Sequence, residues 1–423
     1  MPNGESVMTT TNQISWVDKQ ARSLVLRLLG HLSYGRMVFL EEGSHVATFG
    51  QAAKATDLHA EVNVLHPSFY RRMLLGGSIA SGELYIDNSW ETPDLTAVIQ
   101  VFARNLPALD AFEAKFTWLT LPFQKIQHWR RSNTKVQAKE NISAHYDLGN
   151  TLYREFLDSH MQYSSAVYPS PEATLEEAQE HKLKRLCDAL ELQPSDHLVE
   201  IGTGWGGLAV YAAQNYGCKV TTTTISSEQH KYATELVNKL GLQDQVTLLK
   251  EDYRDLQGQY DKLVSVEMIE AVGERYLPVF FHTCSRLLKP TGKMALQAIT
   301  IADQRMKSYA NSVDFIQKHI FPGGFLPSVQ LMSTLIAEQT DMVVRQLGDI
   351  GLDYAQTLKD WRDRFNAKTE VLAPLGYDDR FSRLWNFYLS YCEGGFRERT
   401  ISAVQFVATK PGCRAFQHSG SLC

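Results

Sequence analysis

The fold is decided by the stretch Leu198-Val199-Glu200-Ile201-Gly202-Thr203-Gly204-Trp205-Gly206-Gly207. Its apolar beginning is typical of a buried strand, and its glycines form a turn in which the backbone can approach a ligand closely. Apolar residues at helical spacing follow over 208–215. The stretch therefore predicts a strand, a glycine-rich turn and a helix, as in a nucleotide-binding α/β sheet.

Working outward from this turn, strand and helix patterns alternate. Further strands are predicted over 219–224, 246–249, 262–266 and 293–301, and a helix over 228–240. Strands that alternate with helices predict a parallel sheet with helices on both faces. We therefore expect an α/β, Rossmann-like catalytic domain over residues 140–423.

The residues around the turn indicate which nucleotide binds. Glycines at 202, 204 and 207 satisfy the dinucleotide pattern G-x-G-x-x-G, but the second strand ends in Thr223-Thr224-Ile225-Ser226, without the acid that would hold a nicotinamide ribose. Glu200 suits a ligand that carries a sulfonium and an amino group. Asp252 can accept a hydrogen bond from an adenine amino group, and Tyr253 can pack on the ring, although it can equally be a core residue. The sequence therefore predicts S-adenosyl-L-methionine as cofactor.

The N-terminal residues show a mixture of short strand and helix patterns. A hairpin is predicted from 36–40 and 45–49 around Glu42-Gly43-Ser44, another strand over 60–65, and a helix over 94–105. A helix over 68–75 is expected to stop at Gly76-Gly77. These elements predict a small α+β domain over residues 1–122.

A basic stretch, residues 123–139, follows this domain. It holds Lys125, His128, Trp129, Arg130, Arg131, Lys135 and Lys139, and residues 122–139 hold no acid. Two interpretations stay open: a solvated linker, and a surface that attracts anionic lipid head groups.

Composition limits the classes of function. The chain has 423 residues with a net charge of −5, which gives no reason to expect a nucleic-acid partner. Its six cysteines show no zinc spacing and fit reduced thiols in the cytoplasm. No signal peptide or bilayer-spanning apolar stretch is recognised, so we expect a cytoplasmic enzyme that meets lipid peripherally, at the inner face of the cell membrane.

Seven ordered motifs give the chain a family resemblance: it resembles the cyclopropane-fatty-acid synthase family, which includes the mycolic-acid cyclopropane synthases. The motifs lie at residues 145–150 (HYDLGN), 161–166 (MQYSSA), 200–207 (EIGTGWGG), 252–256 (DYRDL), 269–273 (IEAVG), 321–328 (FPGGFLPS) and 392–397 (CEGGFR). The N-terminal domain resembles the family's lipid-binding accessory domain only loosely.

The resemblance implies a fold, a reaction and a base. The fold is that of a class I S-adenosylmethionine-dependent methyltransferase. The family transfers the methyl carbon to the double bond of an unsaturated acyl chain, usually within a phospholipid. A carbocation forms, a base removes a proton from the new methyl group, and the ring closes. In the family that base is a bicarbonate ion held by Cys, Glu, His and Tyr side chains and a backbone group.

When the family's anion-site residues are matched to this sequence one by one, only some of them agree. Glu270, Tyr354 and the backbone of Ile299 match, whereas Ser165 stands in place of the Cys and Gln297 in place of the His. Glu267 stands where family members often have Gly, near the cofactor. The cofactor contacts that the resemblance implies are Tyr163, Ser164, Glu200, Gly202, Gly204, Gly206, Thr224, Ile225, Gln229, Asp252, Tyr253 and Val266.

The two substitutions leave the end of the reaction open. Gln297 can donate a hydrogen bond to an anion but cannot carry a proton, and Ser165 can offer its backbone N–H and its hydroxyl. Either bicarbonate binds less tightly and the ring still closes, or the base is missing and a methyl-branched unsaturated chain results. We favour ring closure.

The expected substrate is an unsaturated phospholipid at the membrane surface, with no nucleic acid involved, and the oligomeric state stays open, a homodimer being one alternative. Two rival hypotheses are a small-molecule amine N-methyltransferase, which would have no use for a lipid-binding domain, and a lipid-binding scaffold with an inactive site.

Overall fold

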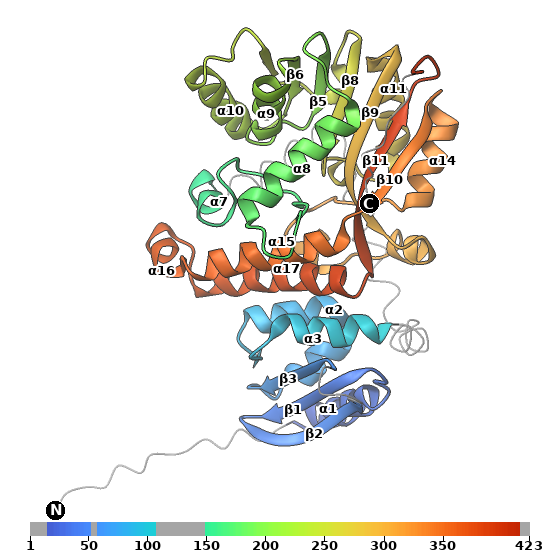
Figure 1. Cartoon of the computed structure of the whole chain (residues 1–423). Helices are drawn as coiled ribbons and strands as arrows, with labels where there is room; N and C mark the ends of the chain where they lie inside the picture. The colour runs from blue at the N-terminus through green and yellow to red at the C-terminus, as the bar shows by residue number, and fades with distance from the viewer. Residues whose placement is uncertain (1–14, 52–56, 107–148, 415–423) are drawn as a thin grey trace, which may run out of the picture. The chain divides into compact units, whose positions relative to one another are not determined.

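The chain divides into two compact units, Met1–Thr120 and Leu121–Cys423, in a computed structural model that describes residues 15–51, 57–106 and 149–414 (Figure 1). Each unit is described by itself. The basic stretch over 123–139 and the first part of the motif at 145–150 lie outside the described residues.

The first unit is a small α+β structure. Its sheet has the order β2-β1-β3-β4, in which β1 runs antiparallel to β2 and parallel to β3. Alternate residues of β1 and β3 are buried, among them Met37, Phe39 and Val62, so these strands have one face in the core. The elements are α1 (Trp16–Leu29), β1 (Gly35–Glu41), β2 (Ser44–Gln51), β3 (His59–Val64), α2 (Phe69–Ile86), β4 (Trp90–Glu91) and α3 (Leu95–Arg104). The predicted hairpin, strand and last helix are confirmed.

The predicted stop at Gly76-Gly77 is confirmed. Gly77 leaves the helical conformation, with φ 54° and ψ −140°, and divides α2 into two helices. The second of these, which continues to Ile86 and buries Leu84 and Ile86, was not predicted.

The second unit contains a seven-stranded sheet within residues 149–414, in the order β10-β11-β9-β8-β5-β6-β7. Strands β5 to β9 are parallel, and β11 runs antiparallel to both β9 and β10. The strands are β5 (His197–Ile201), β6 (Lys219–Thr223), β7 (Val246–Leu249), β8 (Tyr260–Val266), β9 (Leu288–Ile301), β10 (Val343–Asp349) and β11 (Ile401–Thr409). All five predicted strands are present, and the Rossmann-like fold is confirmed.

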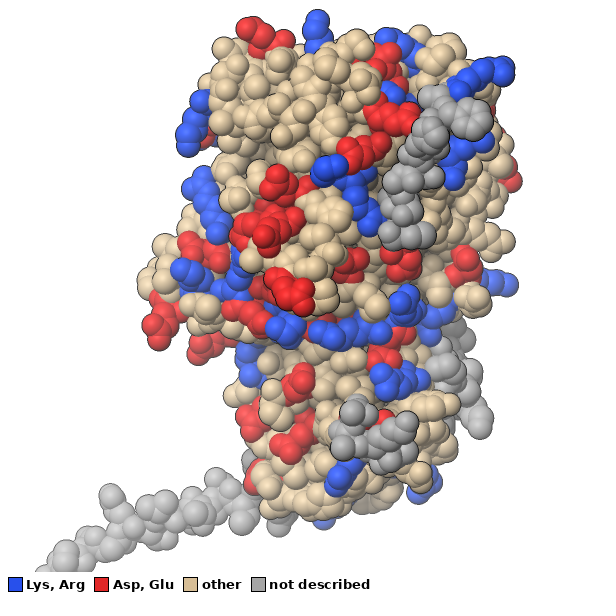
Figure 2. All heavy atoms as spheres, viewed as in Figure 1, with Lys and Arg blue, Asp and Glu red and all other residues tan. Residues whose placement is uncertain are grey.

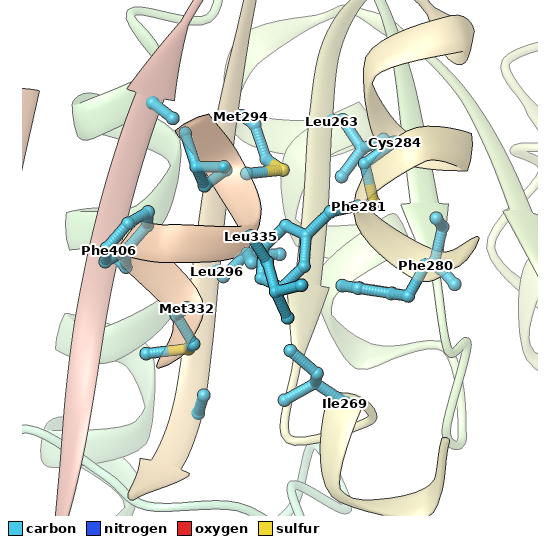
Figure 3. Packing of buried hydrophobic residues seen from close by; sticks show 14 of the residues in the cluster. Leu263, Ile269, Phe280, Phe281, Cys284, Met294, Leu296, Met332, Leu335 and Phe406 are labelled. Carbon is cyan, nitrogen blue, oxygen red and sulfur yellow. The ribbon is translucent and has the colours of Figure 1, made fainter. Parts of the chain in front are cut away.

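Helices cover both faces of this sheet. Alternate strand residues point to opposite sides: Leu198 and Val264 pack with α8, α9 and α10, whereas Leu263 and Leu296 pack with α11 and α14. Figure 3 shows the second core, in which Phe280, Phe281 and Cys284 of α11 and Met332 and Leu335 of α14 meet strand residues of β8, β9 and β11.

The described helices of this unit are α7 (Asn150–Phe156), α8 (Leu175–Leu190), α9 (Gly207–Tyr216), α10 (Ser227–Lys239), α11 (Leu277–Leu287), α12 (Met306–Tyr309), α13 (Phe315–His319), α14 (Val329–Gln339), α15 (Gly351–Asn366), α16 (Thr369–Leu372) and α17 (Asp379–Arg397). Short 3₁₀ helices lie at Tyr253–Asp255, Ile269–Ala271, Glu274–Tyr276, Asp303–Arg305 and Ala373–Leu375. Figure 1 shows α15 and α17 side by side.

The strand order reverses between β5 and β8, because the chain adds β6 and β7 on one side of β5 and β8 and β9 on the other. In open α/β sheets, ligands bind beyond the carboxyl ends of the strands at such a switch point. The turn after β5 and the residues after β8 therefore frame the expected site.

Two surface properties bear on lipid. Among the described residues, no helix is both long enough and apolar enough to cross a bilayer. Acidic and basic side chains are interspersed over the face of the second unit seen in Figure 2.

Candidate active site

The glycine-rich turn lies at the switch point and leaves room beside its backbone. Gly202 and Gly204 have positive φ values of 103° and 51°, which L-residues with side chains rarely adopt. A Cβ atom on Gly202 would lie 3.2 Å from the side chain of Met268, so glycine lets the loops after β5 and β8 approach each other. A Cβ atom on Gly204 would meet nothing within 4 Å. This open backbone fits a ligand that binds against the turn, as S-adenosylmethionine is expected to do.

Glu200 is the last but one residue of β5, and its carboxylate lies against β6. It accepts a hydrogen bond of 2.6 Å from Thr222 Oγ1, which also contacts Thr203 Oγ1 at 2.7 Å. Only 4% of Glu200 is exposed. Burial raises the pKa of Glu200 to about 8, against the opposing effects of the Thr222 hydrogen bond and the Lys182 charge. A cationic ligand group nearby would stabilise its ionised form.

The residues after β6 form a second side of the expected cofactor site. Thr224 Oγ1 donates to Gln229 Oε1 over 2.9 Å and accepts from the N–H of Ser226 at 3.1 Å. Ile225, between them, is half-buried. Thr224, Ile225 and Gln229 thus form one rigid corner where the resemblance places cofactor contacts.

Asp252 and Tyr253 follow β7. Both carboxylate oxygens of Asp252 accept from the Arg254 guanidinium, at 2.7 and 2.6 Å. The Tyr253 ring packs edge-on against Phe280 at 5.6 Å between centroids, at the margin of the core. Both residues stand at the carboxyl edge of the sheet, and their contacts with adenine stay a prediction.

The segment before α8 is fixed by a buried lysine. Lys182 Nζ, wholly buried, donates to Gln162 Oε1 at 2.7 Å and to Ser164 Oγ at 2.9 Å, and Gln179 Nε2 donates to the Ser164 carbonyl at 2.9 Å. Burial lowers the pKa of Lys182 to about 8. These bonds hold the backbone around Ser165 in place.

Glu267 is the centre of the predicted anion site. Its Oε1 accepts from the backbone N–H of Ser165 at 2.8 Å and from Gln297 Nε2 at 2.9 Å, and its Oε2 accepts from Tyr354 Oη at 2.7 Å. Ser165, Gln297 and Tyr354 were predicted to share one site, and the structure brings all three to this carboxylate. Glu267 directly follows β8 and is half-buried as a residue.

The two substituted positions have fixed orientations. The Ser165 hydroxyl, which was expected to be available to an anion, donates instead to the Ala166 carbonyl at 2.8 Å. Gln297 Nε2 also donates to the Ser165 carbonyl at 3.0 Å, and its Oε1 accepts from Gln405 Nε2 at 3.0 Å. The amide of Gln297 is therefore held between β11 and Glu267.

Glu270 lies in the 3₁₀ turn after Glu267. Its Oε1 accepts from the backbone N–H of Ile299 at 2.5 Å, while Oε2 has no hydrogen-bond partner among the described residues. Burial, and next the charge of Glu267, raise the pKa of Glu270 to about 8. The predicted pair of Glu270 and the Ile299 backbone is thus present, and one carboxyl oxygen has no partner among those residues.

Aromatic side chains surround these carboxyl groups. Tyr354 stacks on Phe396 at 4.5 Å and meets Trp361 edge-on at 6.1 Å. Tyr163 lies 5.2 Å from Trp361, and its hydroxyl is 2.9 Å from that of Tyr388. Aromatic faces next to carboxylates favour a cationic species in apolar surroundings.

Three residues of this site were not singled out as site residues from the sequence: Glu267, Lys182 and Gln405. The sequence did draw attention to Glu267, because family members often have glycine at this position. Nothing in the sequence indicated Lys182 or Gln405, because only the fold brings α8 and β11 to the switch point. Val266, predicted as a cofactor contact, ends β8 in register with Gln297.

Comparisons with known proteins show the family of the chain. A family model described as mycolic acid cyclopropane synthetase matches residues 133–406. The chain is 37% identical over 372 residues to the tuberculostearic acid methyltransferase of Mycobacterium tuberculosis, covering 86% of each chain. It is 36% identical over 362 residues to the cyclopropane-fatty-acyl-phospholipid synthase of Escherichia coli K12, covering 83% of this chain and 88% of the relative.

The fold is also that of a solved relative. A mycolic acid cyclopropane synthase complexed with SAH and CTAB superimposes with a TM-score of 0.60 at 29% identity, over 64% of this chain and 98% of that one. Together these matches identify an S-adenosylmethionine-dependent enzyme.

Proposed function

Because the chain belongs to the mycolic acid cyclopropane synthetase family, we propose that it transfers the methyl carbon of S-adenosylmethionine to the double bond of an unsaturated phospholipid acyl chain and closes a cyclopropane ring. That it uses S-adenosylmethionine and acts as a lipid methyltransferase or cyclopropane synthase follows from the family. The phospholipid substrate and the ring are the proposal.

The observation that carries the proposal is the combination of carboxyl groups and aromatic rings in one site. Glu267 and Glu270 follow β8 at the ligand-binding edge of the sheet, and Tyr354 and Tyr163 belong to the aromatic cluster beside them. A carbocation on an acyl chain needs such an apolar pocket with negative charge nearby.

Each part of the site then has a role. The cofactor supplies an electrophilic methyl carbon. The turn at Gly202 and Gly204 admits it to the backbone, and Glu200 offers a carboxylate to its cationic amino-acid part. Tyr163 and Phe321, both half-buried, offer apolar surface to the acyl chain. The ionised carboxylate of Glu267 stabilises the cation.

The N-terminal unit supports a lipid substrate. The matches to the tuberculostearic acid methyltransferase and to the Escherichia coli synthase run over 372 and 362 residues, more than the second unit contains. A soluble amine needs no such unit. We propose that residues 1–122 and the basic stretch over 123–139 bring the enzyme to anionic membrane surfaces from the cytoplasm. Trp16, Tyr34 and Leu75, exposed in the N-terminal unit, support this role.

A second candidate is formation of a methyl-branched chain. It is favoured by the relative named a tuberculostearic acid methyltransferase, at 37% identity, and by Ser165 and Gln297, which depart from the family's Cys and His. Both candidates share the carbon transfer and differ only in which proton leaves the cation.

The experiment that tests the proposal is lipid mass spectrometry after expression in a host that lacks its own synthase. We expect phospholipids with monounsaturated chains to gain one methylene unit, and saturated ones to stay unchanged. Gly204→Val, which fills the space where the cofactor is expected to approach the turn, serves as the inactive control. No change in the lipids of cells that contain folded wild-type protein would contradict the proposed substrate.

A further inference from the structure

The hydrogen-bond donors of the anion site are already engaged by the chain itself. The Ser165 N–H, the Gln297 amide and the Tyr354 hydroxyl all donate to Glu267 at 2.7–2.9 Å. These three residues stand at positions that the resemblance assigns to bicarbonate. A free anion would have to displace this carboxylate and then lie beside its charge. The site as built therefore does not fit bicarbonate.

The Glu267 carboxylate keeps one position at which it can accept a proton. A carboxylate has about four lone-pair positions. Two on Oε1 are used by Ser165 and Gln297, and one on Oε2 by Tyr354, so the second position on Oε2 is left among the described contacts. Glu267 directly follows β8, so this position lies at the ligand-binding edge of the sheet.

The charges of the site favour an ionised Glu267 beside a protonated Glu270. Glu267 accepts three hydrogen bonds, whereas Glu270 accepts one and has an oxygen without a partner among the described residues. Burial raises the pKa of both, but the hydrogen bonds and the buried Lys182 counteract this for Glu267, and the Glu267 charge adds to it for Glu270. Two close carboxyl groups hold one proton between them most readily.

The backbone at Glu267 lies in a region that favours glycine. Its φ is 48°, in the left-handed region. A residue with a side chain costs on the order of 1 kcal/mol there. Replacement by glycine would therefore relax the backbone while it removes the carboxylate, which makes Glu267→Gly a usable test.

We propose that Glu267 is the base of the reaction, built into the chain in place of a free bicarbonate ion. This rests on the proposed carbon transfer. The alkene π electrons bond to the methyl carbon while the carbon–sulfur bond breaks and its electron pair stays on sulfur. Oε2 of Glu267 then takes a proton from the transferred carbon. The electrons of that C–H bond close the ring, and Glu267 afterwards releases the proton to solvent.

The first test is turnover with unsaturated phospholipid vesicles in buffer freed of carbon dioxide. We expect the wild type to keep its activity there and to gain less than twofold from added bicarbonate. Glu267→Gly relaxes the backbone and frees the three donors. Its turnover in this buffer should be at least 100-fold below that of the wild type, and added bicarbonate should raise it at least 10-fold. Glu267→Gln, which keeps the shape but accepts no proton, should not recover. Glu42→Gly, at a φ of 46° in the N-terminal hairpin, controls for the glycine.

The second test needs no lipid and so separates this proposal from the proposed function. Binding of ¹³C-bicarbonate is followed by NMR, with S-adenosylmethionine binding as the check that each variant is folded. We expect binding to Glu267→Gly and none to the wild type or to Glu267→Gln. Wild type that binds bicarbonate as tightly as Glu267→Gly, or that needs it for turnover, would overturn the proposal. Lack of any lipid product with this binding pattern intact would overturn only the proposed function.

Discussion

Tyr354 Oη donates a hydrogen bond of 2.7 Å to Glu267 Oε2, and this bond joins the first turn of α15 to the loop after β8. Stacking on Phe396 fixes the tyrosine ring. Burial and the Glu267 charge raise the pKa of Tyr354 well above its ordinary value, so the phenol stays a donor. An element that the sequence did not predict thus orients the carboxylate at the centre of the site.

Tyr354→Phe should therefore weaken catalysis while leaving the cofactor site intact. Loss of a hydrogen bond to a charged group costs about 1.5–3 kcal/mol, or roughly 10- to 100-fold in kcat/KM. The pKa of Glu267 should rise, so the acidic limb of the pH–rate profile should move to higher pH. Tyr260→Phe, whose hydroxyl bonds the Gln257 carbonyl away from the site, is the control. An unchanged pH profile in Tyr354→Phe would argue against the role of this bond.

Substitutions in the glycine-rich turn should weaken cofactor binding. Glu200→Ala removes a charge partner and should cost about 1.5–3 kcal/mol of S-adenosylmethionine affinity by calorimetry. Gly204→Val fills the space beside the backbone. Gly241→Val is its control, because Gly241 also has a positive φ and a Cβ atom added to it would meet nothing within 4 Å, but it lies in the turn after α10. Equal affinity of the Gly204 and Gly241 variants would refute the placement of the cofactor.

The acidic groups of the site should make stability depend on pH. The pKa of Glu270 rises from 4.5 to about 8 in the folded protein, so the folded state binds more protons than the unfolded state between these values. The free energy of unfolding should then fall as pH rises through this window. Glu270→Gln, which carries no charge to bury at high pH, should be more stable than the wild type near about pH 9 by thermal unfolding. A less stable variant at that pH would contradict the assignment.

The patterns that predicted the fold were local ones. The turn at 202–207 and the alternation of strands and helices were sufficient for β5 to β9, because buried parallel strands are short apolar runs between helices. Strands β10 and β11 and helices α15 and α17 were not predicted. The register of β11 with β9 is set by tertiary pairing such as Gln405 opposite Gln297, and β10 pairs in turn with β11, which no local pattern encodes.

The site was predictable as far as residue types matched known motifs. Glu270, Tyr354 and Ile299 were named from the sequence, and so were the substituted positions Ser165 and Gln297. The contacts of Glu267 could not be predicted, because its three donors come from the segment before α8, from β9 and from α15. Which donor reaches which oxygen is decided by the packing of segments that lie far apart in the sequence.

Membrane association should depend on the basic stretch. Arg130→Ala with Arg131→Ala should reduce co-sedimentation with anionic vesicles, since each basic residue near such a surface contributes about 1 kcal/mol, and salt should weaken binding of the wild type. Lys231→Ala with Lys239→Ala, exposed on α10, removes the same charge elsewhere. Binding that changes neither with the anionic lipid content of the vesicles nor with the salt concentration would contradict this role.

The central claim is tested most directly by counting label in the product. The purified enzyme is incubated with monounsaturated phospholipid vesicles and trideuteromethyl S-adenosylmethionine, and the acyl chains are analysed by mass spectrometry. Because a base at Glu267 removes one proton from the transferred carbon, we predict a cyclopropane chain that keeps two deuteriums. Chains that keep all three would show that the proton leaves a neighbouring carbon, and the enzyme would then form methyl-branched chains instead.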